Sequence, residues 1–315
     1  MGTTAYIGNG AYCYANSTAM LLHSIGEKIA PSLIEVLTGV GLGAMWEEAL
    51  QFAWFNGRVA PDEGIGRALD LLGFTFLAQG CDTTSAPPVE DLRTHLKDGP
   101  AVVGPLDMGM LLYHPNHSYL GGSDHYVLVY AADDENVYLH DPAGYPHVSL
   151  AWEPFGLAWR AEKIPYRRYP YQFWTRPSRQ RTPAEQELFG QAIRYFQTVY
   201  RETEEEAGQK GLPCCEKAIR AFADAIEQET ITPEGRNHMR YFLFQLGARR
   251  ALDYANFFAR RLPGLARLKE RQAQLFGTCH VHAVADNRQD LAAALRALAH
   301  AEEQFRHALM LVDPV

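Results

Sequence analysis

The sequence has no long apolar run and few cysteines. No stretch approaches the roughly 18 consecutive apolar residues needed to cross a bilayer, and the first residues lack the basic-then-apolar order of a signal peptide. Five cysteines in 315 residues are too few and too irregularly spaced for a disulfide framework. We therefore expect a cytoplasmic protein with free thiols and no membrane partner.

Basic residues are scarce in the first half of the chain. Residues 1–160 hold six Lys or Arg against eighteen Asp or Glu, whereas the remainder holds 23 against 19. The net charge of −8 argues against a nucleic-acid partner. The asymmetry indicates two modules with different partners, composition drift being the alternative. An acidic first half would attract an amine-bearing small molecule, although ordinary solubility explains it almost as well.

The apolar content of 47% supplies a sizeable core. Residues 13–25 read as a buried helix. Short runs rich in Val, Tyr, Phe and Leu follow, bounded by Gly, Asp, Asn and Pro, which is typical of strands. These runs are Gly73–Gln79, Pro100–Leu106, His125–Ala131, Val137–Asp141 and His147–Trp152. The first half therefore predicts an α+β fold with helices early and a sheet late.

The second half has a helical pattern. A Pro-, Arg- and Tyr-rich stretch predicts a linker at 166–182, between an α+β domain at 1–165 and an all-α domain at 183–315. Thr182-Pro183-Ala184-Glu185 and Thr232-Pro233-Glu234 are typical helix starts, with a capping side chain and a first-turn proline. Two further helices are expected at about 264–285 and 288–311, as in a helical bundle.

Cys13 is the candidate nucleophile. It follows a Gly- and Asn-rich loop and starts the apolar helix. The unsatisfied amide groups at a helix start favour a thiolate, and they could also hold a developing oxyanion. A structural, buried cysteine is the commoner alternative.

His125 and Asp141 supply the partners that a nucleophilic thiol needs. His125 heads one predicted strand, and Asp141 ends the next, after the turn at 133–136. Antiparallel pairing brings these ends together. A carboxylate there would fix the imidazole tautomer while the ring takes the thiol proton. Alternatively, His125 merely starts a strand and Asp141-Pro142 is a turn.

The order Cys, strand-heading His and strand-ending Asp resembles the papain-like superfamily. More closely, Pro100–Asp141, the helix containing Cys13 and the Gly-rich Thr38–Met45 resemble the N-terminal domain of the butirosin-biosynthesis acyltransferase family. The resemblance covers residues 1–165 by motif and the rest by layout, since members of that family also carry a helical domain after the catalytic one.

The resemblance implies a papain-like fold that transfers an acyl group from a carrier-protein thioester, through Cys13, onto an amine. It makes Cys13 the nucleophile, His125 the general base and later acid, and Asp141 the residue that orients the ring. Papain-like peptidases place a Gln six residues before the Cys, where this chain has Ile7, and Asn9 is the nearest substitute as oxyanion donor. The alternatives are a cysteine peptidase or amidase, and a catalytically silent binding module.

The segment between the Pro100 strand and His125 is long enough to fold over a cleft. It offers four substrate-binding candidates: Asp107, Tyr113, His114 and His117. Asp107 either holds a substrate amine or caps a turn. Basic residues at 249–271 form a candidate docking face for an acidic acyl carrier protein, a solvated helix face being the commoner alternative. The sequence leaves the oligomeric state open.

Three further patterns are weaker functional signals. Cys279-His280-Val281-His282 contains zinc-type ligands but has no second cluster at ligand spacing, so we expect no metal and no cofactor. Gly39-Val40-Gly41-Leu42-Gly43 departs from the dinucleotide fingerprint, and we expect these glycines to let backbone segments approach near the cleft. The adjacent Cys214 and Cys215 are expected to pack at a helix start.

Overall fold

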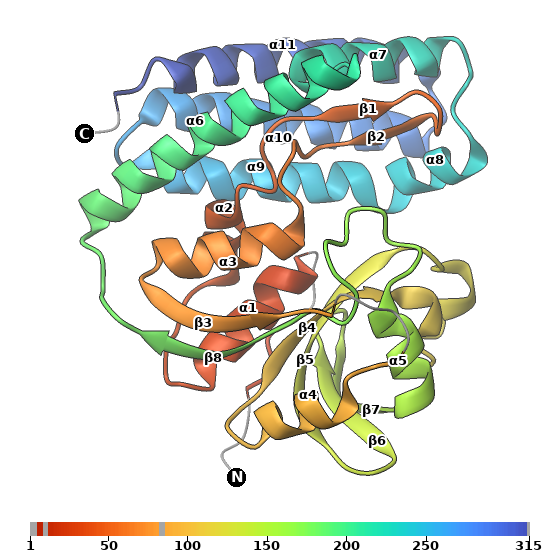
Figure 1. Ribbon diagram of the computed structural model, residues 1–315. Coiled ribbons are helices and arrows are strands. Elements are labelled where there is room, and N and C mark those ends of the chain that lie inside the picture. The colour runs from red at the N-terminus through yellow and green to blue at the C-terminus, as the bar shows by residue number, and fades with distance from the viewer. Residues whose placement is uncertain (1–4, 9–11, 82–85, 314–315) are drawn as a thin grey trace. The chain divides into compact units, whose positions relative to one another are not determined.

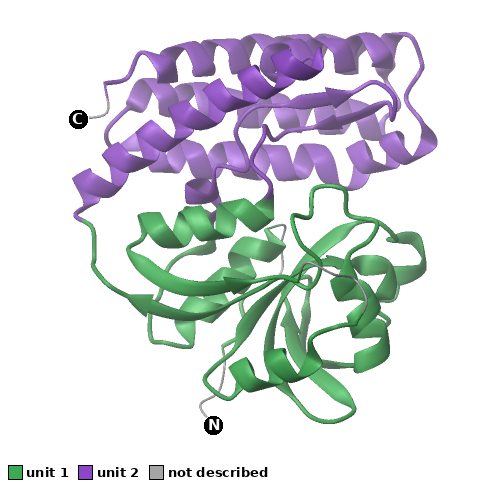
Figure 2. Cartoon of the chain, viewed as in Figure 1, with its two compact units in different colours: residues 1–34, 61–183 green, residues 35–60, 184–315 purple. Residues whose placement is uncertain are grey.

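The computed structural model describes residues 5–8, 12–81 and 86–313, which form two compact units. Unit 1 comprises residues 1–34 and 61–183, and unit 2 comprises 35–60 and 184–315 (Figure 2). The chain passes into unit 2 within α2 (Pro31–Thr38) and is back in unit 1 from α3 (Pro61–Leu71). The observed division thus differs from the expected 1–165 and 183–315, because residues 35–60 group with the helical unit and unit 1 extends to residue 183.

Unit 1 is built on a six-stranded antiparallel sheet with the strand order β3-β8-β4-β5-β6-β7 (Figure 1). The strands are β3 (Phe74–Gln79), β4 (Ala101–Asp107), β5 (Asp124–Ala132), β6 (Asn136–Asp141), β7 (Tyr145–Ala151) and β8 (Phe173–Arg179). Five of them match the strands predicted from the sequence, which confirms the α+β class. β8 lies in the range expected to be a linker, and it pairs with both β3 and β4.

One face of this sheet forms an apolar core with α4 (Val89–Leu96) and α5 (Trp152–Arg160). Alternate residues of β5, such as Val127 and Val129, join Phe155 and Trp159 in a single buried cluster. Trp159 satisfies its indole N–H by donating to the carbonyl of Gln172 at 2.8 Å. This bond ties α5 to the start of β8.

The predicted apolar helix is α1 (Cys13–His23), and every residue from Tyr14 to Leu22 is buried. It packs against β5 and β4. Ser17 donates a 3.1 Å hydrogen bond to the carbonyl of Tyr126 in β5. Because Ser17 lies one helical turn after Cys13, and Tyr126 directly follows His125, this bond fixes the register of the helix start against the strand that carries the histidine.

Unit 2 consists of a helical bundle and a short hairpin of β1 (Met45–Glu47) and β2 (Phe52–Trp54). Its helices are α6 (Glu185–Lys210), α7 (Cys215–Glu227), α8 (Pro233–His238), η3 (Met239–Leu243), α9 (Phe244–Ala259), α10 (Pro263–Val284) and α11 (Arg288–Met310). The hairpin packs on α7, while α10 packs on α9 and α11 (Figure 1). None of the helices in the described part of the chain has the length and apolarity that a membrane crossing requires.

Of the two helix starts predicted from the sequence, the one at Thr232 is confirmed and the one at Thr182 is not. Thr232 caps α8 by accepting a 3.1 Å hydrogen bond from the amide of Gly235, with Pro233 as the first helical residue. Thr182 does not cap α6, which begins later, at Glu185, after an N-cap at Ala184 that has no side-chain bond. Cys215 opens α7, as the packing interpretation predicts, and its amide donates to the carbonyl of Ala44 at 2.7 Å.

Candidate active site

Cys13 is the first residue of α1 and is half-buried. The preceding residue, Tyr12, is 3% exposed and adopts the left-handed conformation with φ 76°. This region is uncommon for a residue other than glycine, and strained backbone of this kind tends to gather at functional sites. The thiol therefore stands at the positive end of a buried helix, after a backbone turn that the surrounding packing must hold in place.

His125 and Asp141 meet across the β5–β6 ladder. Leu128 pairs with His140, which brings the end of β6 at Asp141 towards the start of β5, where His125 lies. Nε2 of His125 and Oδ1 of Asp141 are 2.6 Å apart. The two residues are 5% and 0% exposed respectively, so the ion pair is screened little by solvent.

Asp141 is held by two further donors. The amide of Ala143 donates to Oδ1 at 2.7 Å, and the hydroxyl of Tyr113 donates to Oδ2 at 2.8 Å. Burial alone would raise the pKa of Asp141, but the charge of His125 and these hydrogen bonds outweigh it and hold the pKa below its usual range. The carboxylate is therefore ionised and fixed in orientation.

Cys13 is the second partner of the His125 ring. Burial on its own would lower the pKa of His125, but the charge of Asp141 and the hydrogen bonds to Asp141 and Cys13 raise it well above its ordinary value. Since Nε2 faces Asp141, Nδ1 is the nitrogen left for the thiol. The arrangement Cys13, His125, Asp141 is thus one in which a cationic imidazolium can lie between a thiolate and a carboxylate.

The four substrate-binding candidates divide into different roles. Oδ1 of Asp107 accepts 2.9 Å hydrogen bonds from the amides of Gly109 and Gly122, so this buried carboxylate is a turn cap and the amine-binding alternative is not supported. Tyr113 holds Asp141. Nδ1 of His117 lies 3.2 Å from the carbonyl of Gly109 and closes the same segment.

His114 remains beside the catalytic cluster. Its ring packs edge-on against Tyr145, with centroids 5.2 Å apart. Its pKa is lowered by burial and by the neighbouring His125 and His117, against the opposing pull of Asp141. Asn9, the candidate oxyanion donor, lies outside the described residues.

Sequence reasoning missed several residues around this cluster. Tyr6 donates from its hydroxyl to the carbonyl of Asp141 at 3.1 Å. On the other side of β5, the hydroxyl of Tyr166 donates to Asp124 at 2.6 Å and lies 3.3 Å from that of Tyr126. The tyrosines are plain in the sequence, but only the tertiary fold shows which carboxylates they reach.

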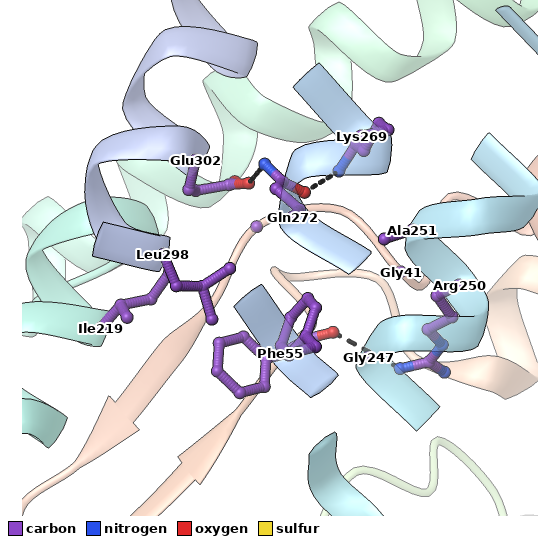
Figure 3. A pocket seen from close by; sticks show the side chains of 12 residues that line it. Gly41, Phe55, Ile219, Gly247, Arg250, Ala251, Lys269, Gln272, Leu298 and Glu302 are labelled. Atoms are coloured by element: carbon purple, nitrogen blue, oxygen red, sulfur yellow. Dashed lines mark hydrogen bonds between the residues drawn. The ribbon is translucent and has the colours of Figure 1, made fainter. Parts of the chain in front are cut away.

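The basic stretch at 249–271 does not form one surface. Arg250 is buried and its Nε donates to Glu35 at 2.8 Å. Lys269 is 3% exposed, and its Nζ donates to Gln272 at 2.9 Å, which in turn donates to Glu302 beside a cavity of about 20 Å³ (Figure 3). Those two residues cannot contact a carrier protein, whereas Arg249, Arg267 and Arg271 are exposed.

The remaining sequence motifs also lie in unit 2. Gly39 and Gly41 face side chains of Tyr195 and Arg250 there, so the Gly-rich segment packs within unit 2. Cys279 is buried in α10, which raises its pKa to about 12. Within the described ranges, no group of three or more His, Cys, Asp or Glu side chains is placed to hold a metal ion.

Comparison with known proteins places the chain among relatives without an assigned activity. Residues 209–310 match the sequence model of the YobF C-terminal domain. Over 310 residues, which is 98% of both chains, the sequence is 45% identical to the uncharacterized protein YobF of Bacillus subtilis (strain 168). No family of butirosin-biosynthesis acyltransferases or papain-like peptidases matches. At this identity and coverage, the chain belongs to the YobF family.

Proposed function

We propose that the protein is a cysteine-dependent acyltransferase of papain-like fold, which moves an acyl group from a thioester to an amine. The observation that carries the proposal is the position of His125, which lies 2.6 Å from the buried Asp141 and whose pKa is raised by both Asp141 and Cys13. The antiparallel sheet, with the cysteine at the start of a buried helix against β5, supports the papain-like assignment. This combination fits nucleophilic acyl chemistry.

The reaction has two halves. The Cys13 thiolate attacks the thioester carbonyl, and the C–S bond to the donor breaks as imidazolium His125 gives its proton to the departing thiol. The neutral ring then takes a proton from the incoming amine, which attacks the acyl-enzyme to form an amide. Cys13 leaves as the thiolate and His125 is again cationic, so every proton is accounted for.

Asp141 acts through His125 and is a positioning residue. It stabilises the imidazolium and leaves Nδ1 facing the thiol. The first amides of α1 supply donors for the tetrahedral oxyanion, with Asn9 as the candidate side-chain donor. The acidic first half favours an acceptor that carries positive charge elsewhere in the molecule, while the amino group that attacks is neutral. We propose an acyl carrier protein as donor, with the exposed Arg249, Arg267 and Arg271 as its docking residues.

Acylation by a small thioester tests the proposal. An acyl N-acetylcysteamine thioester is mixed with the full-length protein, and intact and peptide mass spectrometry locate the added acyl mass. The expected result is modification of Cys13 that is lost in Cys13→Ala and retained in Cys81→Ala, a control in the same unit. Addition of 1,4-diaminobutane should then release the acyl group as an amide.

Other outcomes assign other functions. Release of the free acid at the same rate with and without amine would indicate a hydrolase, and cleavage of peptides without any thioester would indicate a peptidase. Absence of acylation on a folded protein with a labelling-competent Cys13 would contradict the acyltransferase and leave a binding module.

A further inference from the structure

Unit 2 contains a cavity of about 320 Å³ that the proposed chemistry does not use. Its walls come from the end of α7, the connection to α8, α8 itself, the first residues of η3, the end of α10 and the start of α11. This volume is at the lower end of the range of small-molecule sites. The cavity can therefore accommodate a compact organic ligand.

The floor of the cavity is apolar. Ile226, Ile231, Met239, Ala283 and Leu291 line it, and each belongs to the main buried cluster of the unit with 3–5% of its surface exposed. These residues are fixed by the core around them, so the floor is a preformed surface that would take the apolar body of a ligand.

The polar part of the lining has an excess of one positive charge. It contains the guanidinium groups of Arg236, Arg240 and Arg288, the carboxylates of Glu229 and Asp286, and the ring of His282. Arg236 donates to the carbonyl of Ile231, and Nε of Arg240 donates to the carbonyl of Ala283 at 3.0 Å. Arg240 also pairs with Asp286 at 3.2 Å and Arg288 pairs with Glu229, so Arg236 supplies the excess positive charge of the lining.

Two of the lining residues lie in a π-helical turn. Met239 and Arg240 open the π-helical segment η3 and both line the cavity. Isolated π-helical turns are rare and occur frequently at functional sites. Here the irregular turn presents an apolar side chain of the floor and a charged side chain of the rim as neighbours along the chain.

We propose that this cavity binds a small amphipathic monocarboxylate. A planar carboxylate matches the fork of a guanidinium group, and its apolar body matches the buried floor. Glu229 and Asp286 disfavour a dianion, so the single excess charge selects a monoanion. All eleven lining residues fall within 209–310, the segment that matches the YobF C-terminal domain, so the site belongs to that domain alone. This inference does not depend on the function of Cys13.

Calorimetric titration of the full-length protein with octanoate tests the site, with 1-octanol, octylamine and octyl phosphate as matched probes. Octanoate is expected to bind at millimolar concentration or below, and each of the other three at least about tenfold more weakly. Arg236→Gln should weaken octanoate about tenfold or more, because it removes a charged hydrogen-bond donor. Arg220→Gln, which changes an exposed arginine of α7 outside the cavity, should leave the affinity unchanged.

A second variant separates loss of the site from loss of the fold. Ala283→Met fills the floor and should abolish octanoate binding while the circular dichroism spectrum stays that of the parent. If Arg236→Gln does not fold, Arg288→Gln takes its place, since Arg288 is half-exposed in its pair with Glu229. Equal binding of octanol or octylamine, unchanged affinity in a folded Ala283→Met, or no octanoate binding at all would overturn the proposal.

Discussion

The hydroxyl of Tyr113 donates a 2.8 Å hydrogen bond to Oδ2 of Asp141, the oxygen that His125 does not use. Tyr113 lies in the loop between β4 and β5, and Asp141 ends β6, so the bond ties the segment over the cluster to the sheet. Tyr113, a substrate-binding candidate from the sequence, supports the orienting carboxylate.

Replacing Tyr113 with Phe should therefore lower stability. The change leaves a buried carboxylate oxygen without its donor, and we expect a loss of about 1–3 kcal/mol in the free energy of unfolding. Urea denaturation followed by tryptophan fluorescence measures it. Tyr119→Phe is the control, because Tyr119 is in the same loop and is 88% exposed. Equal stability of the two variants would show that Tyr113 does not support Asp141.

Alkylation of Cys13 should depend on His125. With its pKa raised well above the ordinary value, His125 is cationic at pH 6 and can stabilise a thiolate there. Brief treatment with low-excess iodoacetamide at pH 6 should label Cys13 selectively, and His125→Ala should slow that labelling by about tenfold or more. Peptide mapping identifies the site, and His300→Ala, an exposed change in α11, should not alter the rate. Indiscriminate labelling of the five cysteines would count against an activated thiol.

Removing the charge of Asp141 should reverse the pKa shift of His125. Burial alone lowers that pKa, and the carboxylate is the larger of the two influences that raise it, so Asp141→Asn should lower the pKa of His125. Two-dimensional NMR of the histidine ring nitrogens across a pH titration reports this directly. Asp134→Asn, an exposed carboxylate paired with Arg93, is the control.

The ion pair of His125 and Asp141 should stabilise the folded protein over a limited range of pH. A raised pKa of His125 contributes stability that is fully present below about pH 6.5 and is lost as pH rises through the folded-state pKa. A lowered pKa of Asp141 contributes stability that is present above about pH 3.9 and is lost on further acidification. The stability deficit of Asp141→Asn should thus be greatest between about pH 4 and 6.5, and a deficit that grows at alkaline pH would contradict the ion pair.

The sequence anticipated local features well. Alternating Val, Tyr and Leu between turn residues predicted five strands, because a half-buried strand needs that pattern wherever it lies in the fold. Helix α1 and the cap at Thr232 were predicted for the same reason. The meeting of His125 with Asp141 needed one further step, the antiparallel pairing of neighbouring strands.

Features that depend on distant parts of the chain were not anticipated. β8 contains Arg176, Pro177 and Arg179 and reads as a linker, yet it is an interior strand stabilised by partners 70 to 105 residues away. Residues 35–60 belong to unit 2, but no change in composition marks this segment in the sequence. Asp107 could be a cap or a ligand by sequence, and only the positions of Gly109 and Gly122 decide between them.

His238 should make unit 2 sensitive to acid. Its ring lies among Phe52, Trp54 and Phe242, and in the part of the chain that the structure describes its Nε2 has no hydrogen-bond partner. Burial lowers its pKa to about 4. Because the unfolded chain binds the proton more readily, stability should fall by about 2–3 kcal/mol as pH drops from 6.5 to 4.

His238→Phe keeps the stacking and removes the titrating group. Its free energy of unfolding should lose correspondingly less than that of the parent over this range, whereas the exposed change His300→Ala should follow the parent. Parallel pH dependence of His238→Phe and the parent would show that the ring is not buried in its neutral form.

Lys269 should make the stability of the protein rise with pH in the alkaline range. It is buried in unit 2 against the ring of Phe305, with its Nζ 3.9 Å from the ring centroid, and burial lowers its pKa from 10.5 to about 8 despite the nearby Glu302. Between about pH 8 and 10.5 the unfolded chain binds this proton and the folded chain does not, so stability rises with pH. The full contribution is about 3 kcal/mol.

Lys269→Met retains the volume of the side chain without the charge, and urea denaturation at pH 7.5 and 10.5 should show the parent gaining that amount relative to the variant. Groups that titrate equally in both proteins cancel in this comparison, and Lys210→Met, at an exposed lysine paired with Glu206, should track the parent at both values. If the parent gains no stability relative to Lys269→Met, the lysine is solvated in solution and the Lys269–Gln272–Glu302 chain does not form the buried network described for unit 2.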